Sequence, residues 1–127
     1  MAAGNYTFTI EQGSTTDFQV DWKDAAGARI DLIPYTARMQ IRSGYGSNST
    51  LYASLSNTLD SDGTGLNFSG SNNNQPLSSG SIGIFISAAS SSAFNFADAR
   101  YDLEMVSGSH VTRLLQGKIK LSYEVTV

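Results

Sequence analysis

Apolar and polar residues alternate along most of the chain, and this alternation constrains the fold more than any other feature of the sequence. Tyr6, Phe8 and Ile10 alternate with threonines near the start, and Ile119 and Leu121 alternate with lysines near the end. A period of two places successive side chains on opposite faces of a β-strand, so each segment has one face for a core. The pattern predicts eight or nine short strands, among them the segments 6–10, 18–22, 37–42, 51–55, 66–68, 82–86, 100–105 and 111–127.

Turn residues separate these segments, and helical spacing is nearly absent. Clusters of Gly, Asn, Asp and Ser between short alternating segments favour antiparallel strands in an all-β sandwich. A chain of 127 residues is the size of one domain, so residues 1–127 are predicted to form a single β-sandwich. At most one short helical turn is expected, over 87–94 with Ser87 as its cap. Segment 82–86 is apolar at nearly every position and is therefore predicted to be a central strand.

Gly117 interrupts the long alternating segment 111–127. Four apolar residues share the odd positions of this segment, namely Val111, Leu115, Ile119 and Leu121. The strand is therefore expected to keep its register, while a glycine inside it predicts a bulge or a bend at Gly117. Arg113 breaks the apolar face and is expected to form an ion pair with Asp102 or Glu104.

Charge and composition exclude several classes of protein. The 8 basic and 11 acidic side chains give a net charge of -3, and there is no cysteine. Dispersed, slightly negative charge is unfavourable for binding a phosphate backbone, so we expect no nucleic-acid partner. Without cysteine there is no disulfide framework and no thiolate metal site. We expect no membrane association either, because no apolar segment is long enough to span a bilayer and the first residues lack the pattern of a signal peptide.

Catalytic motifs are missing as well. The sole histidine, His110, follows Ser-Gly-Ser and is predicted to lie at a hairpin tip. A catalytic base needs a nucleophile within hydrogen-bond reach and a group that orients it, and a hairpin tip supplies neither. The sequence therefore predicts a protein without catalytic residues, without a cofactor and without enzymatic activity.

Asp60 and Asp62 are the only candidate metal ligands. Two carboxylates two residues apart, followed by Gly63, partly resemble the start of a calcium-binding EF-hand loop. The glutamate at the twelfth position and the flanking helices are missing, and Asp-Gly between Leu59 and Leu66 is a strong hairpin signal. We predict a turn here and no metal site, with a bound cation as the alternative.

Two segments of low complexity, 43–50 and 69–81, are predicted to be loops, and either is a candidate contact with a neighbouring subunit. Arginine and tyrosine are enriched at protein interfaces. The candidate interface residues lie in or beside the first loop and on the polar face of the strand before it: Arg38, Arg42, Tyr45 and Tyr52. The alternative, that these side chains only face solvent, stays open.

Three phrases of the sequence carry a family resemblance. They are DAAGARIDL followed by YTARMQIR, IFISAA leading into ARYDLE, and VTRLLQGKI ending in EVT. Their order resembles small virion proteins of tailed bacteriophages, and it is similar to the N-terminal domain of phage baseplate upper proteins. The resemblance covers most of the chain, from about Phe8 to the end. It implies an immunoglobulin-like sandwich in which Tyr101 resembles a corner tyrosine, with a buried ring and a hydroxyl that bonds to the backbone.

The resemblance implies a non-enzymatic structural subunit of a bacteriophage particle, in the tail, the baseplate or the fibre-attachment region. Its partners are expected to be other virion proteins and further copies of the chain, and its location the virion, after assembly in the host cytoplasm. Since baseplate upper proteins continue beyond this domain, a free-standing adaptor, plug, collar or decoration subunit is favoured. The N-terminal segment, up to Ile10, and the C-terminal segment, through Val127, are each expected to be an edge strand that a partner can dock against. The alternatives are a capsid decoration (cement) protein and, from another class, a carbohydrate-binding module for host attachment.

Overall fold

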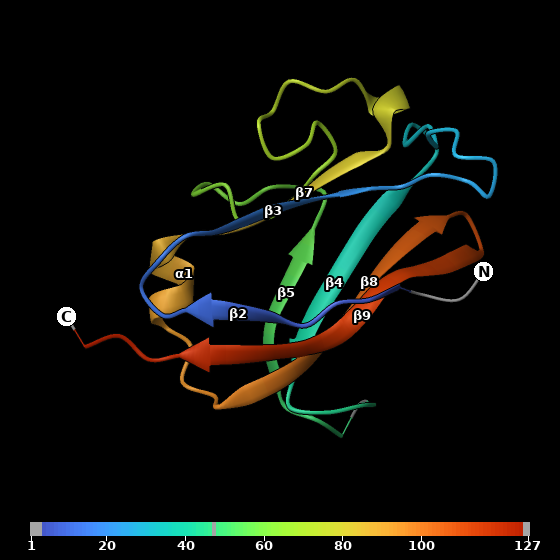
Figure 1. The fold of residues 1–127 in the computed structure, drawn as a ribbon. Helices are drawn as coiled ribbons and strands as arrows, with labels where there is room; N and C mark the ends of the chain where they lie inside the picture. The colour runs from blue at the N-terminus through green and yellow to red at the C-terminus, as the bar shows by residue number, and fades with distance from the viewer. Residues whose placement is uncertain (1–3, 47, 126–127) are drawn as a thin grey trace.

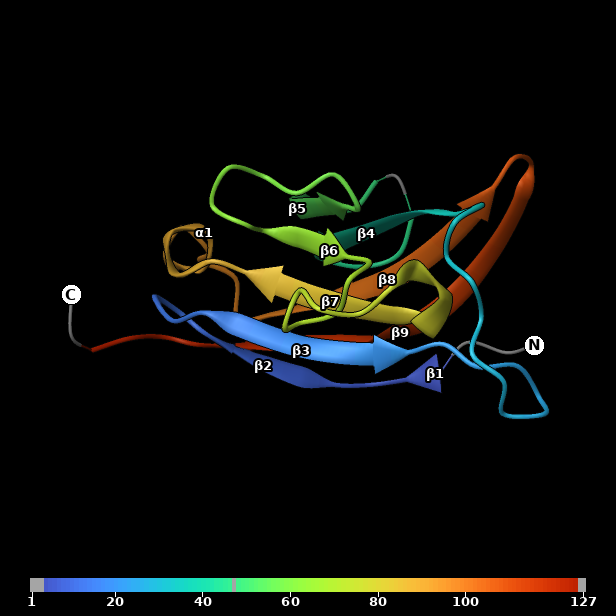
Figure 2. The same ribbon diagram turned by 90° about the horizontal axis from the view of Figure 1, so that it is seen from above.

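The computed structural model describes residues 4–46 and 48–125, which form two β-sheets packed face to face (Figure 1). The larger sheet has the strand order β1 (Gly4–Asn5) and β2 (Phe8–Glu11) at one edge, then β9 (His110–Ser122), β8 (Asp98–Ser107), β4 (Thr36–Arg42) and β5 (Leu51–Ser56). The smaller sheet has the order β3 (Thr16–Asp21), β7 (Ser81–Ile86) and β6 (Gly65–Asn67). In Figure 2 these three strands run side by side in front of the larger sheet. The predicted all-β sandwich is confirmed.

The connections between the strands are those of an immunoglobulin-like sandwich. β1 and β2 run parallel to β9, whereas the other strand pairs are antiparallel. The chain therefore starts beside its own last strand, crosses to the smaller sheet as β3, and returns to the larger sheet as β4 and β5. It then forms β6 and β7 in the smaller sheet before β8 and β9 complete the larger one.

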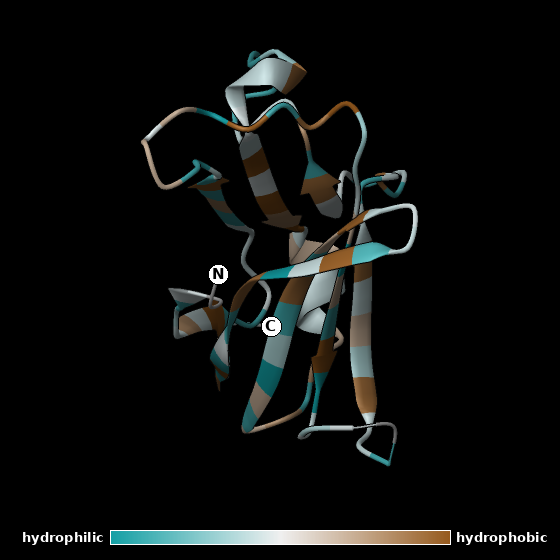
Figure 3. Ribbon diagram, turned by 90° about the vertical axis from the view of Figure 1, so that its right-hand side faces the viewer, coloured by the Kyte–Doolittle hydropathy of each residue, from teal (hydrophilic) through white to brown (hydrophobic). Residues whose placement is uncertain are grey.

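The alternating sequence explains which side chains fill the space between the sheets. Hydrophobic and hydrophilic bands follow one another along the strands in Figure 3. β8 buries Ala99, Tyr101, Leu103 and Met105 and leaves the residues between them partly exposed. One continuous core forms in this way, because each strand contributes its apolar positions to the same interior.

β7 is the central strand of the smaller sheet, as predicted, and both of its faces are covered. Its isoleucines point into the core, and its outer face lies under the loop that precedes it. A methyl group at Gly83 would lie 2.7 Å from backbone atoms of Gly70 and Ser71, and the Ser71 N–H donates to Gln19 at 3.0 Å. The second low-complexity segment thus packs on its own sheet, which only a glycine at position 83 permits.

The helical content is small. α1 (Ala88–Ser92) follows β7, and the Ser87 hydroxyl accepts a hydrogen bond from the Ser90 N–H at 3.0 Å, as predicted for its cap. A single 3₁₀ turn, η1 (Leu77–Ser79), was not predicted. Over the residues that the structure describes, no helix has the length and hydropathy needed to cross a membrane.

The bulge in β9 lies at Leu114 and not at Gly117, so the predicted position of a bulge and the predicted unbroken register of this strand were both wrong. Leu103 pairs with Leu115, but the next residue of β8 pairs with Arg113, which leaves Leu114 without an opposite residue. The extra residue shifts the side chains before it by one position. Val111 is consequently 47% exposed. Strict alternation would have placed it on the same face as the buried Ile119, because both have odd residue numbers.

The predicted strand edges are half correct. β1 and β2 form an edge of the larger sheet, but β9 lies between them and β8 and therefore offers no free edge from Gln116 to Ser122. β9 ends at Ser122, before the predicted end of the strand, and Val125 is exposed. Val127 lies outside the described residues.

Gly117 makes room for the segment between β1 and β2 instead. The Tyr6 carbonyl group lies so close to Gly117 that a methyl group there would collide with it. Tyr101, the cross-strand partner of Gly117, donates a hydrogen bond from its hydroxyl to this same carbonyl at 2.6 Å. Burial raises the pKa of the Tyr101 hydroxyl, which therefore stays protonated and donates. The predicted hydrogen bond from the Tyr101 hydroxyl to the backbone is confirmed. Its acceptor is 95 residues upstream in the N-terminal segment, whereas a corner tyrosine bonds to the backbone a few residues upstream, so that part of the prediction was wrong.

Substitutions at these two positions should destabilise the sandwich. We expect Tyr101→Phe to lower the free energy of unfolding by about 1–3 kcal/mol, because the Tyr6 carbonyl loses its buried donor. Gly117→Ala should cost a similar amount, about 1–3 kcal/mol, because the chain at Tyr6 must move away. The two effects should be less than additive in a double-mutant cycle measured by urea denaturation. Gly44→Ala is the control, since nothing lies within 4 Å of a methyl group there. Full additivity would contradict the shared contact.

Candidate functional site

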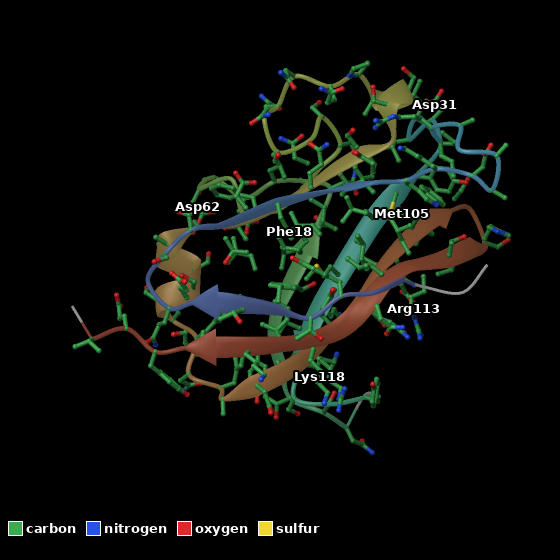
Figure 4. All side chains as sticks on the ribbon, in the orientation of Figure 1. Phe18, Asp31, Asp62, Met105, Arg113 and Lys118 are labelled. Carbon is green, nitrogen blue, oxygen red and sulfur yellow. The ribbon has the colours of Figure 1, made fainter. Side chains whose placement is uncertain are left out.

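The outer face of the larger sheet, which points away from the smaller sheet, carries most of the positive charge of the protein. Six of the eight basic residues of the chain lie on it: Arg38, Arg42, Arg100, Arg113, Lys118 and Lys120. Four carboxylates share this face, those of Glu11, Asp98, Asp102 and Glu104. The side chains of the face therefore carry a net charge of two positive units, while the remaining seven acidic and two basic residues carry five negative units. Figure 4 shows Arg113 and Lys118 on this side of β9.

Part of this charge is compensated within the face. The Arg38 Nε atom lies 2.8 Å from Glu104 Oε1, and the Arg113 Nε atom lies 3.5 Å from Asp102 Oδ2. The Arg113–Asp102 pair confirms one of the two predicted partners. Burial, followed by the charge of Glu104, raises the pKa of Asp102, and the two arginines oppose this shift.

One row of the face has no such compensation. Arg42, Arg100 and Lys118 are cross-strand neighbours on β4, β8 and β9, and we call them the cationic row. Within residues 4–46 and 48–125, none of the three forms an ion pair. Like charges placed directly opposite each other destabilise a sheet. The row therefore lowers the stability of the isolated protein, and a binding partner with negative charge would relieve it.

The β4–β5 loop completes the row. The Arg42 guanidinium donates to Gln40 Oε1 at 2.9 Å and to the Ser49 carbonyl at 3.0 Å, which holds it against the loop. Tyr45 is 81% exposed, and its ring centroid lies 5.0 Å from the Arg100 guanidinium carbon in a cation–π contact. The row and Tyr45 line a shallow hollow of about 750 Å³, together with neutral polar groups such as Thr7 and Gln116.

The structure brings together three of the four candidate interface residues. Arg38, Arg42 and Tyr45 lie on or beside the outer face. Tyr52 does not join them, because its ring stacks on Phe96 with centroids 4.6 Å apart and packs against the core.

Sequence reasoning missed Arg100 and Lys118. Both occupy outward positions of alternating segments, which the period of two identifies. Their position opposite each other and beside Arg42 depends on strand register, and the unexpected bulge at Leu114 contributes to that register.

Asp60 and Asp62 lie in the predicted turn. The Asp60 carbonyl accepts from the Gly63 N–H at 2.9 Å. The Asp62 carboxylate accepts from the Ser87 hydroxyl at 2.6 Å, the Ser90 hydroxyl at 3.3 Å and the Thr64 N–H at 3.0 Å. Asp62 thus ties the turn to the start of α1, which is the role that the structure gives it. Among the described residues, no three potential metal ligands of the His, Cys, Asp and Glu types lie together.

His110 lies where the sequence predicts it, in the hairpin between β8 and β9 opposite Ser107, and it is exposed.

Comparisons with known proteins add no relative, since no family model matches the chain and no curated protein matches it significantly. The candidate site therefore depends on geometry alone.

Acid should remove the contribution of Asp62 to stability. Its hydrogen bonds, foremost that from Ser87, lower the pKa of Asp62 from 3.8 to about 2. A carboxyl group whose pKa is lower in the folded state stabilises the fold above the unfolded-state pKa, and this contribution disappears as the pH falls from 3.8 through about 2. We expect Asp62→Asn to have a lower melting temperature than the unsubstituted protein at neutral pH, and the difference to shrink over that interval.

The control for this experiment is Asp60→Asn, since no hydrogen bond to the Asp60 carboxylate occurs in the described part of the chain. Its melting temperature should follow that of the unsubstituted protein at every pH. Calcium and a chelator should each leave the melting temperature unchanged. A difference between Asp62→Asn and the unsubstituted protein that stays constant down to about pH 2 would contradict the assigned role of the ionised carboxylate.

Proposed function

We propose that the protein is a non-enzymatic structural subunit of a bacteriophage particle, an adaptor in the tail, baseplate or fibre-attachment region that acts through protein–protein assembly. The resemblance of its sequence to phage virion proteins supplies the biological setting. The outer face of the larger sheet supplies the docking surface.

The observation that carries this proposal is the cationic row. A strand face that only contacts water gains nothing from three adjacent cations, and such a row lowers the stability of the sheet. Opposite charges across an interface, in contrast, steer two partners together and fix their register. The exposed Tyr45 contacts Arg100 beside the row. Tyrosine and arginine are the residue types that often contribute most to binding at protein interfaces.

The ionisable groups with shifted pKa values support a non-enzymatic role. The Tyr101 hydroxyl donates a hydrogen bond to the Tyr6 carbonyl in the N-terminal segment. The Asp62 carboxylate accepts a hydrogen bond from Ser87, which joins the turn to the start of α1. Asp21 bonds to Ser81 and Gln19 and pairs with Arg29, and together these contacts outweigh its partial burial and lower its pKa. Asp102 pairs with Arg113. Each group has a structural task, whereas a catalytic site would gather such groups around one cavity.

One observation favours a second candidate function, a carbohydrate-binding module for host attachment. Tyr45 is exposed beside a hollow lined by neutral and charged hydrogen-bonding groups, and aromatic rings beside polar groups suit the faces and hydroxyls of sugars. This candidate ranks second because the Tyr45 ring already contacts Arg100.

Fractionation of phage particles tests the assembly role. An antibody against the chain should detect it in purified particles and, after their disassembly, in the tail fraction. Detection in the capsid fraction would instead favour the capsid decoration protein. Recovery only as free protein, apart from the particles, would overturn both assembly roles.

A glycan array tests the second candidate. Under the assembly proposal we expect no specific glycan signal from the protein or from its Tyr45→Ala variant. Binding to a defined glycan that Tyr45→Ala abolishes would favour the carbohydrate-binding module. Arg38→Ala serves as the control, since Arg38 lies on the same face but outside the row and forms its own pair with Glu104.

A further inference from the structure

The outer face of the smaller sheet carries the opposite charge. Asp17 on β3 lies directly opposite Phe85 on β7, and Phe85 in turn lies opposite Gly65 on β6. The turn of residues 60–63 adjoins the same ring, because a methyl group at Gly63 would lie 3.4 Å from it. Asp17 therefore lies beside a partly exposed phenylalanine, and Asp60 and Asp62 lie in the turn that adjoins its ring. We call these three residues the acidic surface.

No basic side chain offsets the acidic surface among the described residues of the smaller sheet. Lys23 and Arg29 follow the far end of β3, where Arg29 pairs with Asp21. The hydrogen bonds to Asp62 keep the pKa of this carboxyl low, so it is charged at every physiological pH. Within the described residues, the sandwich thus has three cations without an ion-pair partner on one outer face and three carboxylates without a basic partner on the other, where Asp21 is paired with Arg29.

The two surfaces lie on opposite sides of the molecule. In Figure 4, Lys118 lies below β9 on the outside of the larger sheet, and Asp62 lies above β3 beside α1. One copy therefore cannot bring its own two surfaces together. A second copy can present its acidic surface to the row.

We propose that the cationic row of one copy binds the acidic surface of a second copy of this chain. Residues Arg42, Arg100 and Lys118 meet residues Asp17, Asp60 and Asp62. The exposed ring of Tyr45 and the partly exposed ring of Phe85 give each surface an aromatic contact. This inference builds on the proposed assembly role and names one partner.

The contact is heterologous, because the two surfaces differ. Each copy keeps one free row and one free acidic surface after the first contact. Such a contact produces a closed ring when its rotation closes, and an open stack when it does not. A ring or stack of copies is an arrangement suited to an adaptor at a symmetric position of a particle.

Sedimentation of the purified protein tests the contact. At about 20 mM salt we expect concentration-dependent association as the protein is raised to about 1 mM, and loss of association at about 500 mM salt, where the Debye length is only about 4 Å. Lys118→Glu and Asp17→Lys should each weaken association at least about tenfold, since each replaces an attraction by a repulsion. Both residues are exposed, and circular dichroism verifies that the variants fold.

Mixing the two variants is the decisive experiment. Lys118→Glu keeps an intact acidic surface, and Asp17→Lys keeps an intact row. An equimolar mixture should therefore regain association that neither variant shows alone. An interface in which one surface pairs with itself would not be restored in this way, so failure of the mixture to associate overturns the proposal.

Two controls match the changes in net charge. Lys23→Glu and Glu124→Lys change the charge by the same amounts at exposed positions outside both surfaces, and they should associate as the unsubstituted protein does. Equal losses in these controls would mean that only net charge matters, and they would overturn the assigned surfaces. A protein that stays monomeric at about 1 mM and low salt would overturn self-association. The assembly role would still stand if the chain fractionates with particles, in which case the row binds another virion protein.

Discussion

The parallel pairing of β1 and β2 with β9 is the constraint on which the rest of the structure depends. It joins the start of the chain to its last strand, so that β1 and β2, and not β9, form this edge of the larger sheet. The pairing is possible because β9 has no side chain at Gly117, where the backbone at Tyr6 lies against it. The Tyr101 hydroxyl then reaches the Tyr6 carbonyl from the next strand. The segment between β1 and β2 is thus held against β8 and β9 at one point, by a hydrogen bond and by the absence of a side chain.

The same sheet has a charged exterior because of strand register. The alternation that buries Tyr101 and Leu103 on β8 exposes Arg100 and Asp102. Pairing with β4 and β9 then sets the neighbours of these residues. Asp102 and Glu104 compensate two arginines, while Arg100 falls between two further cations. The exterior is therefore organised in rows. The row of Arg42, Arg100 and Lys118, which forms no ion pair within the described residues, carries the positive charge that both proposals use.

Much of the fold could be predicted from the sequence, and less of the candidate site. The period of two located the strands, identified β7 as central and placed Arg38 and Arg42 on a polar face, because burial of alternate side chains is a local property of a strand. Tyr52 shows where this reasoning fails, since it lies beside a loop in the sequence but stacks on Phe96, which is distant along the chain. Val111 shows a second failure, because the bulge at Leu114 changes the face of every residue before it.

By itself, the sequence determined that the protein is a β-sandwich with one capped helical turn and a polar exterior. These features follow from alternation, turn residues and Ser87, which act over a few neighbouring residues. Only the tertiary structure decided that Gly117 admits the N-terminal segment, that Asp62 holds α1, and that Arg42, Arg100 and Lys118 form one row. Each of these depends on which strands pair and in which register, and pairing between distant strands is set by the packing of the whole core rather than by any single segment.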